Sequence, residues 1–505
     1  MRIIILFISF IFTVAHLKSQ NLNPADVIEF ARSKAYQKDF IGADKLLTEY
    51  NSHQKDINAL RLHAQVLYWM KDFDRSVKTY EKTLANYPNI AVVKLDYARM
   101  LFEMGKFKRA RSLLLDFIET DNLHAEANIM LAYINLWAGD IQPAKYRADL
   151  LLEHYPGNKE ATDILKQIHT YTAPYITVGA NFQSDDQPKT GTGFAIEAGV
   201  YRSRFLSPML QLQYNNFKIT DGSYPSLWIE AGNKINYGKG SGLSLAAGLF
   251  QQINSGNNYF TGSVGLTQKI SRYFTGEAGI VKRPYQYSVA SLKNAVFENI
   301  LSVAAGFNKG EKWLGKAGFQ RENFADGNNI NTSYLWFLAP LVIRKNFKIQ
   351  AGYAFSYANA DKNIFVAAAP LTTLINTFPL YGSVPGVYDP YFTIKNQIIN
   401  ALLASVNITL SPKVQLSSRT NIGVYAKADN PYLFLEKNTA NQQYFINKGY
   451  STLKYTPVEW VSNLQFKLSP QFSIQIDYSY QKFLFYTNNL GGIQLKYNFV
   501  HGPIR

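Results

Sequence analysis

The chain has 505 residues, of which 47% are hydrophobic and 14% aromatic, and its formal net charge is +16. This length and apolar content support two or three packed domains and exclude a disulfide-stapled miniprotein or a disordered tail. Cysteine is absent, which excludes disulfides, a thiolate metal site and a cysteine nucleophile. The charge is uneven: residues 21–170 carry 20 basic and 20 acidic side chains, whereas residues 171–505 carry 30 basic and 16 acidic ones.

The first residues have the pattern of a secretory signal peptide. Arg2 precedes an apolar run from Ile3 to Ala15, and a polar stretch ending in Gln20 follows. The run is shorter than the roughly 18 to 20 residues that a membrane helix needs. We therefore expect residues 1–19 to be a signal peptide. The alternative is an uncleaved N-terminal anchor.

Residues 20–170 contain a motif that recurs four times, with offsets of 33, 34 and 34 residues. The four copies are Lys38-Asp39-Phe40-x-x-Ala43, Lys71-Asp72-Phe73-x-x-Ser76, Gly105-Lys106-Phe107-x-x-Ala110 and Gly139-Asp140-Ile141-x-x-Ala144. Two prolines, Pro88 and Pro156, lie 68 residues apart, which is two periods. This pattern resembles the tetratricopeptide repeat, whose period is 34 residues.

The residue types fit the mechanics of such a helical pair. A small residue lets the second helix approach the first, an aromatic or aliphatic residue three places earlier fills the gap, and proline ends the pair. The predicted structural anchors are Phe40, Ala43, Phe73, Ser76, Pro88, Phe107, Ala110, Ala144 and Pro156. We expect residues 157–170 to cap the last repeat.

The concave surface of such an array usually holds a peptide or a partner protein. Exposed candidates for that surface are Arg61, Tyr68, Arg99, Asn135 and Trp137. The alternative is that the repeat residues only hold the array together.

From residue 172 to residue 505 the hydrophobic period changes to two. Residues 472–481 and 493–499 alternate apolar and polar side chains, as do 209–218, 259–270, 273–282, 414–427 and 459–467. Each segment predicts a strand with one apolar and one polar face. About 16 such strands fit this region, at about 20 residues each, which is typical of an antiparallel transmembrane β-barrel. The alternative is a soluble β-sandwich or propeller.

The predicted connections alternate in length. Those after even strands are short, and three of them read Leu-Ser-Pro, at 206–208, 410–412 and 468–470. Those after odd strands are mostly longer, reaching about 36 residues at 360–395 and about 21 at 428–448. Outer-membrane barrels have short periplasmic turns and long outer loops. We therefore expect the short turns to face the periplasm.

Strand parity predicts which charged residues line the lumen. The predicted lumen-lining residues are Lys269, Glu277, Arg419, Lys427, Glu459, Lys467, Asp477 and Lys496. A basic, amide-rich lumen suits the passage of an anionic or neutral hydroxyl-rich polymer. The alternative is that these charges neutralise one another across a packed interior.

The 360–395 loop is unusually apolar for a surface loop, so we expect it to pack on something. One interpretation is a constriction whose rings stack on sugars, with the candidates Phe378, Tyr381, Tyr388, Tyr391 and Phe392. The other is a lid that packs on neighbouring loops.

No catalytic or metal-binding residue is predicted. Six of the seven histidines lie within the first 170 residues and the seventh, His501, follows the last predicted strand. A surface hydrolase with a histidine base is therefore not expected. No phosphate-binding loop or metal-ligand spacing stands out, so we expect no cofactor and no nucleic-acid partner.

The order of these parts resembles the outer-membrane components of exopolysaccharide export, such as the outer-membrane component of cellulose synthase and the poly-N-acetylglucosamine porin. The segment 184–188, Ser-Asp-Asp-Gln-Pro, and the Leu-Ser-Pro turns also resemble the YaiO family of barrels. The resemblance implies a polysaccharide port in the bacterial outer membrane, in contact with lipid and lipopolysaccharide. It also implies periplasmic repeats that dock a protein or peptide. The alternative is a non-conducting scaffold whose repeats recruit envelope proteins.

Overall fold

The computed structural model describes residues 24–310 and 312–500, so the predicted signal peptide lies outside the described residues. The chain divides into two compact units. One contains the residues up to 134 together with 146–161, and the other contains 135–145 and the residues from 162 onward. Within the described ranges no helix has the length and hydropathy needed to cross a membrane.

The N-terminal region is helical, as the 34-residue period predicts. Its described helices are α2 (Pro24–Tyr36), α3 (Phe40–His53), α4 (Ile57–Trp69), α5 (Phe73–Asn86), α6 (Ala91–Glu103), α7 (Phe107–Ile118), α8 (Ala125–Ala138), α9 (Ile141–His154) and α10 (Lys159–Thr172). The small residues of the four motifs, Ala43, Ser76, Ala110 and Ala144, are fully buried. Helix α5 ends just before Pro88 and α9 ends just before Pro156.

The first residue of each motif turns the chain between two helices. Lys38, Lys71, Gly105 and Gly139 all have positive φ, between 64° and 80°. A residue in this left-handed conformation commonly ends a helix. Two of the four positions use lysine, which has a steric cost there that glycine does not have.

Aspartates and stacked rings fix the helices that follow these turns. The side chains of Asp39 and Asp72 cap α3 and α5 by accepting hydrogen bonds from backbone N–H groups of the first turn. Between the pairs, Tyr80 and Tyr97 are buried and stack with ring centroids 5.0 Å apart. The helices are therefore specified both by local caps and by the packing between repeats.

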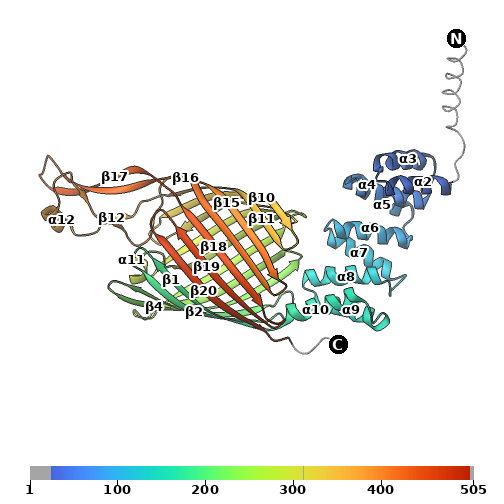
Figure 1. Cartoon of the computed structure of the whole chain (residues 1–505), viewed down its shortest axis with the longest axis horizontal. Helices are drawn as coiled ribbons and strands as arrows, with labels where there is room; N and C mark the ends of the chain where they lie inside the picture. The colour runs from blue at the N-terminus through green and yellow to red at the C-terminus, as the bar shows by residue number, and fades with distance from the viewer. Residues whose placement is uncertain (1–23, 311, 501–505) are drawn as a thin grey trace, which may run out of the picture. The chain divides into compact units, whose positions relative to one another are not determined.

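The C-terminal region is a closed antiparallel barrel of 16 strands, which confirms the predicted fold class (Figure 1). Strand β1 pairs with both β2 and β20, so the sheet has no free edge. The barrel strands are β1 (Tyr175–Asp185), β2 (Thr190–Gly199), β3 (Pro208–Ile219), β4 (Gly222–Gly238), β5 (Ser241–Gln252), β6 (Asn257–Lys269), β7 (Phe274–Tyr285), β8 (Val296–Lys309), β9 (Trp313–Asn323), β10 (Asn329–Arg344), β11 (Phe347–Ala360), β15 (Gln397–Ser411), β16 (Val414–Lys437), β18 (Val458–Lys467), β19 (Phe472–Lys482) and β20 (Thr487–Asn498).

The two ends of the barrel differ as the connection lengths predict. Strands β10 and β11 are joined by two residues, and β15 and β16 are joined by two, all at the end where β1 begins. At the other end, 36 residues (361–396) separate β11 from β15. This long connection contains β12 (Phe365–Ala367), α12 (Leu371–Thr377), β13 (Ser383–Val384) and β14 (Gly386–Tyr388).

The prediction of a loop at 428–448 is wrong. Strand β16 continues to Lys437 and forms a hairpin with β17 (Tyr444–Tyr455) that extends beyond the barrel (Figure 1). Leu433 and Leu435 are buried in this hairpin and cluster with Leu374 of α12 and with Val384. The segment is a strand because it packs on the 361–396 connection, a contact that local sequence does not reveal.

Candidate functional site

The outer face of the barrel is apolar. In β20, Ile493, Leu495 and Tyr497 are 43%, 40% and 39% exposed and alternate with Gln494 and Lys496. The same alternation places exposed apolar side chains on the other barrel strands, including Phe194, Ile229, Phe260, Ile280, Leu335 and Leu402. An apolar outer face on a closed barrel is typical of transmembrane barrels and is consistent with the bacterial outer membrane.

Three of the predicted lumen residues, Glu277, Arg419 and Glu459, form ion pairs. Glu277 bonds the ammonium of Lys316 at 2.6 Å, and Arg419 lies 3.6 Å from Glu459. These contacts join residues of different strands on one face of the sheet. That this face lines the lumen stays a prediction.

The remaining predicted residues have mostly polar surroundings. Asp477 accepts hydrogen bonds from the amides of Asn463 and Gln475. The ammonium of Lys496 lies 4.5 Å from the ring centroid of Tyr175. Register places Lys269 opposite Thr275, on the face of Glu277, and Lys467 opposite Ser473, on the face of Asp477.

Lys427 is separated from Arg419 by an irregularity in the strand. The pairing of β15 with β16 shifts register, so that Asn400 faces Tyr425 while Ala401 faces Gly423. An extra residue on one strand inverts the parity beyond it. Alternation counted from Arg419 therefore does not extend to Lys427.

The long-loop end of the barrel is crossed by the turn between β1 and β2. The ammonium of Lys189 donates hydrogen bonds to the carbonyl oxygens of Gln286 and Tyr287, at 3.1 and 3.2 Å. It also pairs with Asp185 at 3.2 Å, and both side chains are fully buried. Five strands lie between β1 and β7, which leads into Gln286, so these segments meet across the barrel mouth.

Residues 388–392 of the 361–396 connection also pack into this mouth. The ring of Tyr391 stacks on Phe324 with centroids 3.7 Å apart, and its hydroxyl donates a hydrogen bond to Asp326. Phe392 stacks on Phe485 of the β19–β20 turn with centroids 4.7 Å apart.

Hydrogen bonds tie the same segment to the end of β7. The backbone N–H of Phe392 donates to the Tyr285 hydroxyl, and the Ser288 hydroxyl donates to the carbonyl of Pro390. Residues 388–392 with Tyr285, Phe324, Phe485 and Tyr486 are here called the mouth seal. The seal joins loops from four parts of the ring.

The five candidate residues of this connection have different surroundings. Tyr391 is 1% exposed, so its faces are occupied by protein, and Tyr388 and Phe392 are partly buried in the mouth seal. Phe378 is partly buried against the cluster around Leu374, away from the seal. Tyr381 is 67% exposed. The segment thus contains both a packed closure and an exposed ring.

The candidate concave residues of the repeats are largely engaged in pairs. Arg61 pairs with Asp96 at 2.6 Å, and Arg99 pairs with Asp96 and with Glu126. Asn135 is buried rather than exposed. These ion pairs link α4, α6 and α8, so the basic side chains hold successive repeats together.

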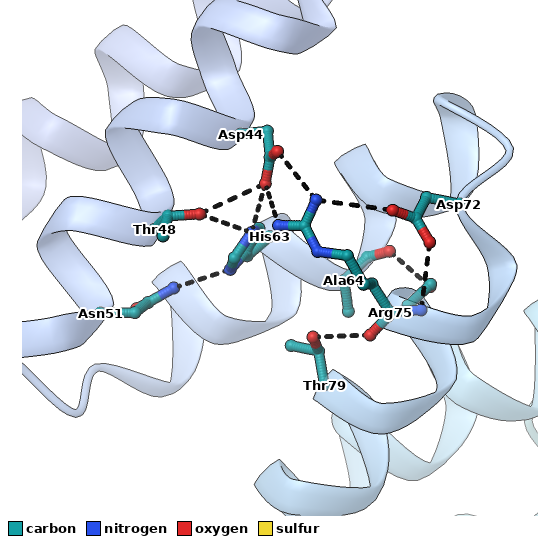
Figure 2. A network of polar contacts seen from close by, with 9 residues as sticks. Asp44, Thr48, Asn51, His63, Ala64, Asp72, Arg75 and Thr79 are labelled. Atoms are coloured by element: carbon teal, nitrogen blue, oxygen red, sulfur yellow. Dashed lines mark hydrogen bonds and ion pairs between the residues drawn. The ribbon is translucent and has the colours of Figure 1, made fainter.

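A second polar network joins α3, α4 and α5 (Figure 2). His63 bonds Asp44 through Nε2 at 2.8 Å and Asn51 through Nδ1 at 3.2 Å, and Arg75 also pairs with Asp44. Burial lowers the pKa of His63, against the opposing effect of Asp44. Burial opposes ionisation of Asp44, yet hydrogen bonds from Arg75 and His63 keep the pKa of Asp44 below its usual value.

Sequence reasoning missed most of the mouth residues. Lys189 follows the quoted segment 184–188, but nothing local marks it as buried. Short turns contain Phe324, Phe485 and Tyr486. Aromatic residues are unusual in turns, so their presence there could have indicated that these turns pack on other parts of the chain.

Comparisons with known proteins concern the two regions separately. The tetratricopeptide repeat family matches residues 58–89. No curated protein matches the chain.

Solved structures resemble each region. A bacterial polysaccharide outer membrane secretin covers 65% of this chain and 99% of its own, with a TM-score of 0.46 and 7% identity. MamA from Desulfovibrio magneticus RS-1 covers 28% of this chain and 81% of its own, with a TM-score of 0.27 and 17% identity. A tetratricopeptide repeat protein from Parabacteroides merdae covers 29% of this chain and 59% of its own, with a TM-score of 0.27 and 14% identity. Such scores and identities are too low to carry a function from one protein to another. The chain combines tetratricopeptide repeats with a 16-strand barrel.

Proposed function

We propose that the barrel is an outer-membrane port for a cell-surface polysaccharide and that the helical repeats dock a periplasmic protein or peptide. In this proposal the chain is a transport protein and not an enzyme. The observation that carries it is the mouth seal: segments from distant strands meet at one end of the barrel and are held together by ring stacking and hydrogen bonds. A closure of this kind can open without breaking a covalent bond.

The sidedness of the proposal rests on the connections. Short turns of outer-membrane barrels lie in the periplasm, and long loops lie outside. The chain enters β1 directly after α10, at the short-turn end. In this orientation the repeats are periplasmic and the mouth seal is on the cell surface. Relationship to the YaiO barrels remains a prediction.

The polymer is proposed from the lumen chemistry. Of the eight predicted lumen residues, Lys427 lies beyond the bulge; four of the other seven are basic and three are acidic, and Glu277 and Glu459 among the acidic ones are paired. Amides such as Gln475 and Asn463 lie among them. This mixture favours an anionic or neutral hydroxyl-rich chain over a strongly cationic one.

One observation favours a second candidate function. The mouth seal buries Tyr391 completely and stacks three pairs of rings, which is more packing than a transient contact needs. A permanently closed barrel would serve as an anchor, and the repeats would then recruit envelope proteins to the membrane.

Conductance in planar bilayers separates the two functions. We compare the intact chain with a variant in which residues 386–393 are replaced by a Gly-Ser linker of equal length. The control replaces residues 438–443, the tip of the β16–β17 hairpin, which lies outside the mouth seal. The port predicts that only the seal variant gains steady conductance, since it alone loses the stacked rings of residues 388–392. If neither variant conducts, the port is wrong and the anchor is favoured.

A second test uses the host cell. Deletion of the gene should leave polysaccharide in the periplasm, and only the full chain should restore export. Unchanged polymer in both places, or rescue by the repeats alone, contradicts the port.

A further inference from the structure

We propose that a chamber inside the barrel, next to the mouth seal, binds uncharged sugar units of the exported chain. The inference rests on the proposed function and adds to it the substrate class and the binding residues. The chamber has a volume of about 540 Å³, within the range of about 300 to 1,000 Å³ typical of small-molecule sites. Gln286 and Tyr287, whose carbonyls hold the β1–β2 turn, belong to its lining.

The chamber is lined by strands that are not neighbours in the ring. Residues of β1, β3, β7 and β19 contribute to one cavity, which is therefore in the lumen and not on the outer face. Side-chain amides dominate its polar lining, namely Asn181, Gln183, Gln213, Asn215, Gln286 and Gln494. An amide both donates and accepts hydrogen bonds, as a sugar hydroxyl or acetamido group does.

An aromatic platform lies in the same lining. The indole N–H of Trp228 donates to the hydroxyl of Thr261 at 2.9 Å, and Thr261 is fully buried. This bond fixes the plane of the indole ring. Phe217 and Tyr287 also contribute to the lining. The apolar face of a pyranose ring packs well on a fixed aromatic ring, which presents a broad apolar surface.

The charges of the lining are balanced and already bonded. Arg283 pairs with Glu298 at 2.6 Å, and Asp477 accepts from the amides of Asn463 and Gln475. The two charged lining residues, Arg283 and Asp477, have opposite signs. Recognition of an anionic polymer needs a surplus of basic groups, and recognition of a cationic polymer needs a surplus of acidic ones. Neither surplus is present in this lining.

One polar group of the lining is left without a partner. The buried Oγ of Ser479 has no hydrogen-bond partner among the described residues. A buried hydroxyl without a partner is unfavourable, so a ligand that bonds it gains affinity. This observation is independent of the amides and of Trp228, and it points to a ligand that forms hydrogen bonds.

Calorimetry on the full chain in nanodiscs tests the inference. The probes are four hexamers: cellohexaose and chitohexaose, which are uncharged, hexaglucosamine, which is cationic, and an oligouronate, which is anionic. They are titrated into the intact chain and into the variant with the linker at 386–393. In the linker variant, which lacks the rings of residues 388–392, we expect the uncharged hexamers to bind at least tenfold more tightly than the charged hexamers.

A matched pair of tryptophans provides the control. Trp228 and Trp460 each donate the indole N–H to a hydroxyl on another strand, but Trp460 is exposed on the apolar outer face. Trp228→Ala should weaken binding about tenfold or more, the effect of losing a buried contact residue. Trp460→Ala should leave it within twofold. Trp228→Phe retains a ring and should lie between the two, so it also serves if the alanine variant fails to fold.

The outcomes separate this inference from the port. Equal binding of charged and uncharged hexamers, absence of binding, or equal effects at Trp228 and Trp460 overturns the chamber. If the linker variant conducts in these cases, the port stands without the chamber. Binding of uncharged hexamers that depends on Trp228, combined with no conductance in any variant, supports the chamber as a binding site and refutes the port.

Discussion

Replacing Lys189 by methionine should loosen the closure of the barrel mouth. The Lys189 ammonium pairs with Asp185 and bonds the carbonyls of Gln286 and Tyr287, and it is fully buried. Methionine keeps the length and apolar volume of the side chain but removes the ammonium. The Asp185 carboxylate then stays buried with only N–H donors from residues 187 and 189.

The expected magnitude follows from the burial of the pair. Removal of one partner from a buried ion pair costs about 3 to 5 kcal/mol, because the other charge is left without compensation. The β1–β2 turn can escape this cost by lifting into water. Since about 1.4 kcal/mol corresponds to a tenfold change, the open form of the turn should become about 100-fold or more populated.

Lys293→Met is the matched control. Lys293 belongs to α11 (Val289–Lys293), just beyond Tyr287, and pairs with Asp221. These two side chains are 45% and 47% exposed. Exposed pairs contribute about 0 to 1 kcal/mol. The control variant should therefore change local opening by less than about tenfold.

Hydrogen exchange on the full chain in nanodiscs measures both effects. Peptides that cover 185–190 and 285–292 should exchange much faster in Lys189→Met, while peptides from β5 should be unchanged. The reasoning is refuted if the two variants accelerate exchange equally. It is also refuted if the change in Lys189→Met spreads over the whole barrel.

Two further predictions concern the repeats. Gly105 has a φ of 76° and open space where a Cβ would lie, so Gly105→Ala should lower the free energy of unfolding by about 1 kcal/mol because of backbone strain alone. Lys71 already has positive φ, so Lys71→Gly should raise the free energy of unfolding slightly. Denaturant unfolding followed by helical circular dichroism measures both changes, and changes of the same sign would contradict the argument. Lowering the pH should destabilise helices α3 to α5. The pKa of His63 is lower in the folded chain, so below about pH 6.5 the unfolded chain binds a proton more readily and the folded state loses stability. The pKa of Asp44 is also lowered, so further stability is lost below about pH 4. Exchange of α3 peptides against pH checks this, and His63→Gln should remove the upper step alone.

The helical repeats and the barrel could be predicted because their signals are local. A small residue such as Ala43 or Ser76 must recur wherever two helices meet, and a strand with two different environments must alternate. Turn length between strands is also a local property. These signals sufficed for the fold class and for the two ends of the barrel.

Contacts across the lumen have no such signal. Lys189 meets Tyr287 nearly 100 residues away, and nothing local in the sequence marks Lys189 as buried. The apolar 360–395 loop predicts that Tyr391 packs on something, but not that its partner is Phe324. Parity also fails at a bulge, as at Gly423 to Tyr425 before Lys427. Arg99 resembled an exposed ligand contact but pairs with Glu126, because a charge in a repeat can serve the next repeat.

The pairing of β1 with β20 sets an order on folding. Tyr175 pairs with Asn498, so the ring cannot close before its last strand is present. Until then β1 and β19 are open edges, which invite pairing with other chains. The repeats depend only on neighbouring helices and can fold during this time. Loss of the last strand should therefore spare the helices and leave an aggregation-prone sheet. A barrel that lacks one strand exposes two unpaired strand edges, whereas a shortened helical array exposes only its last helix.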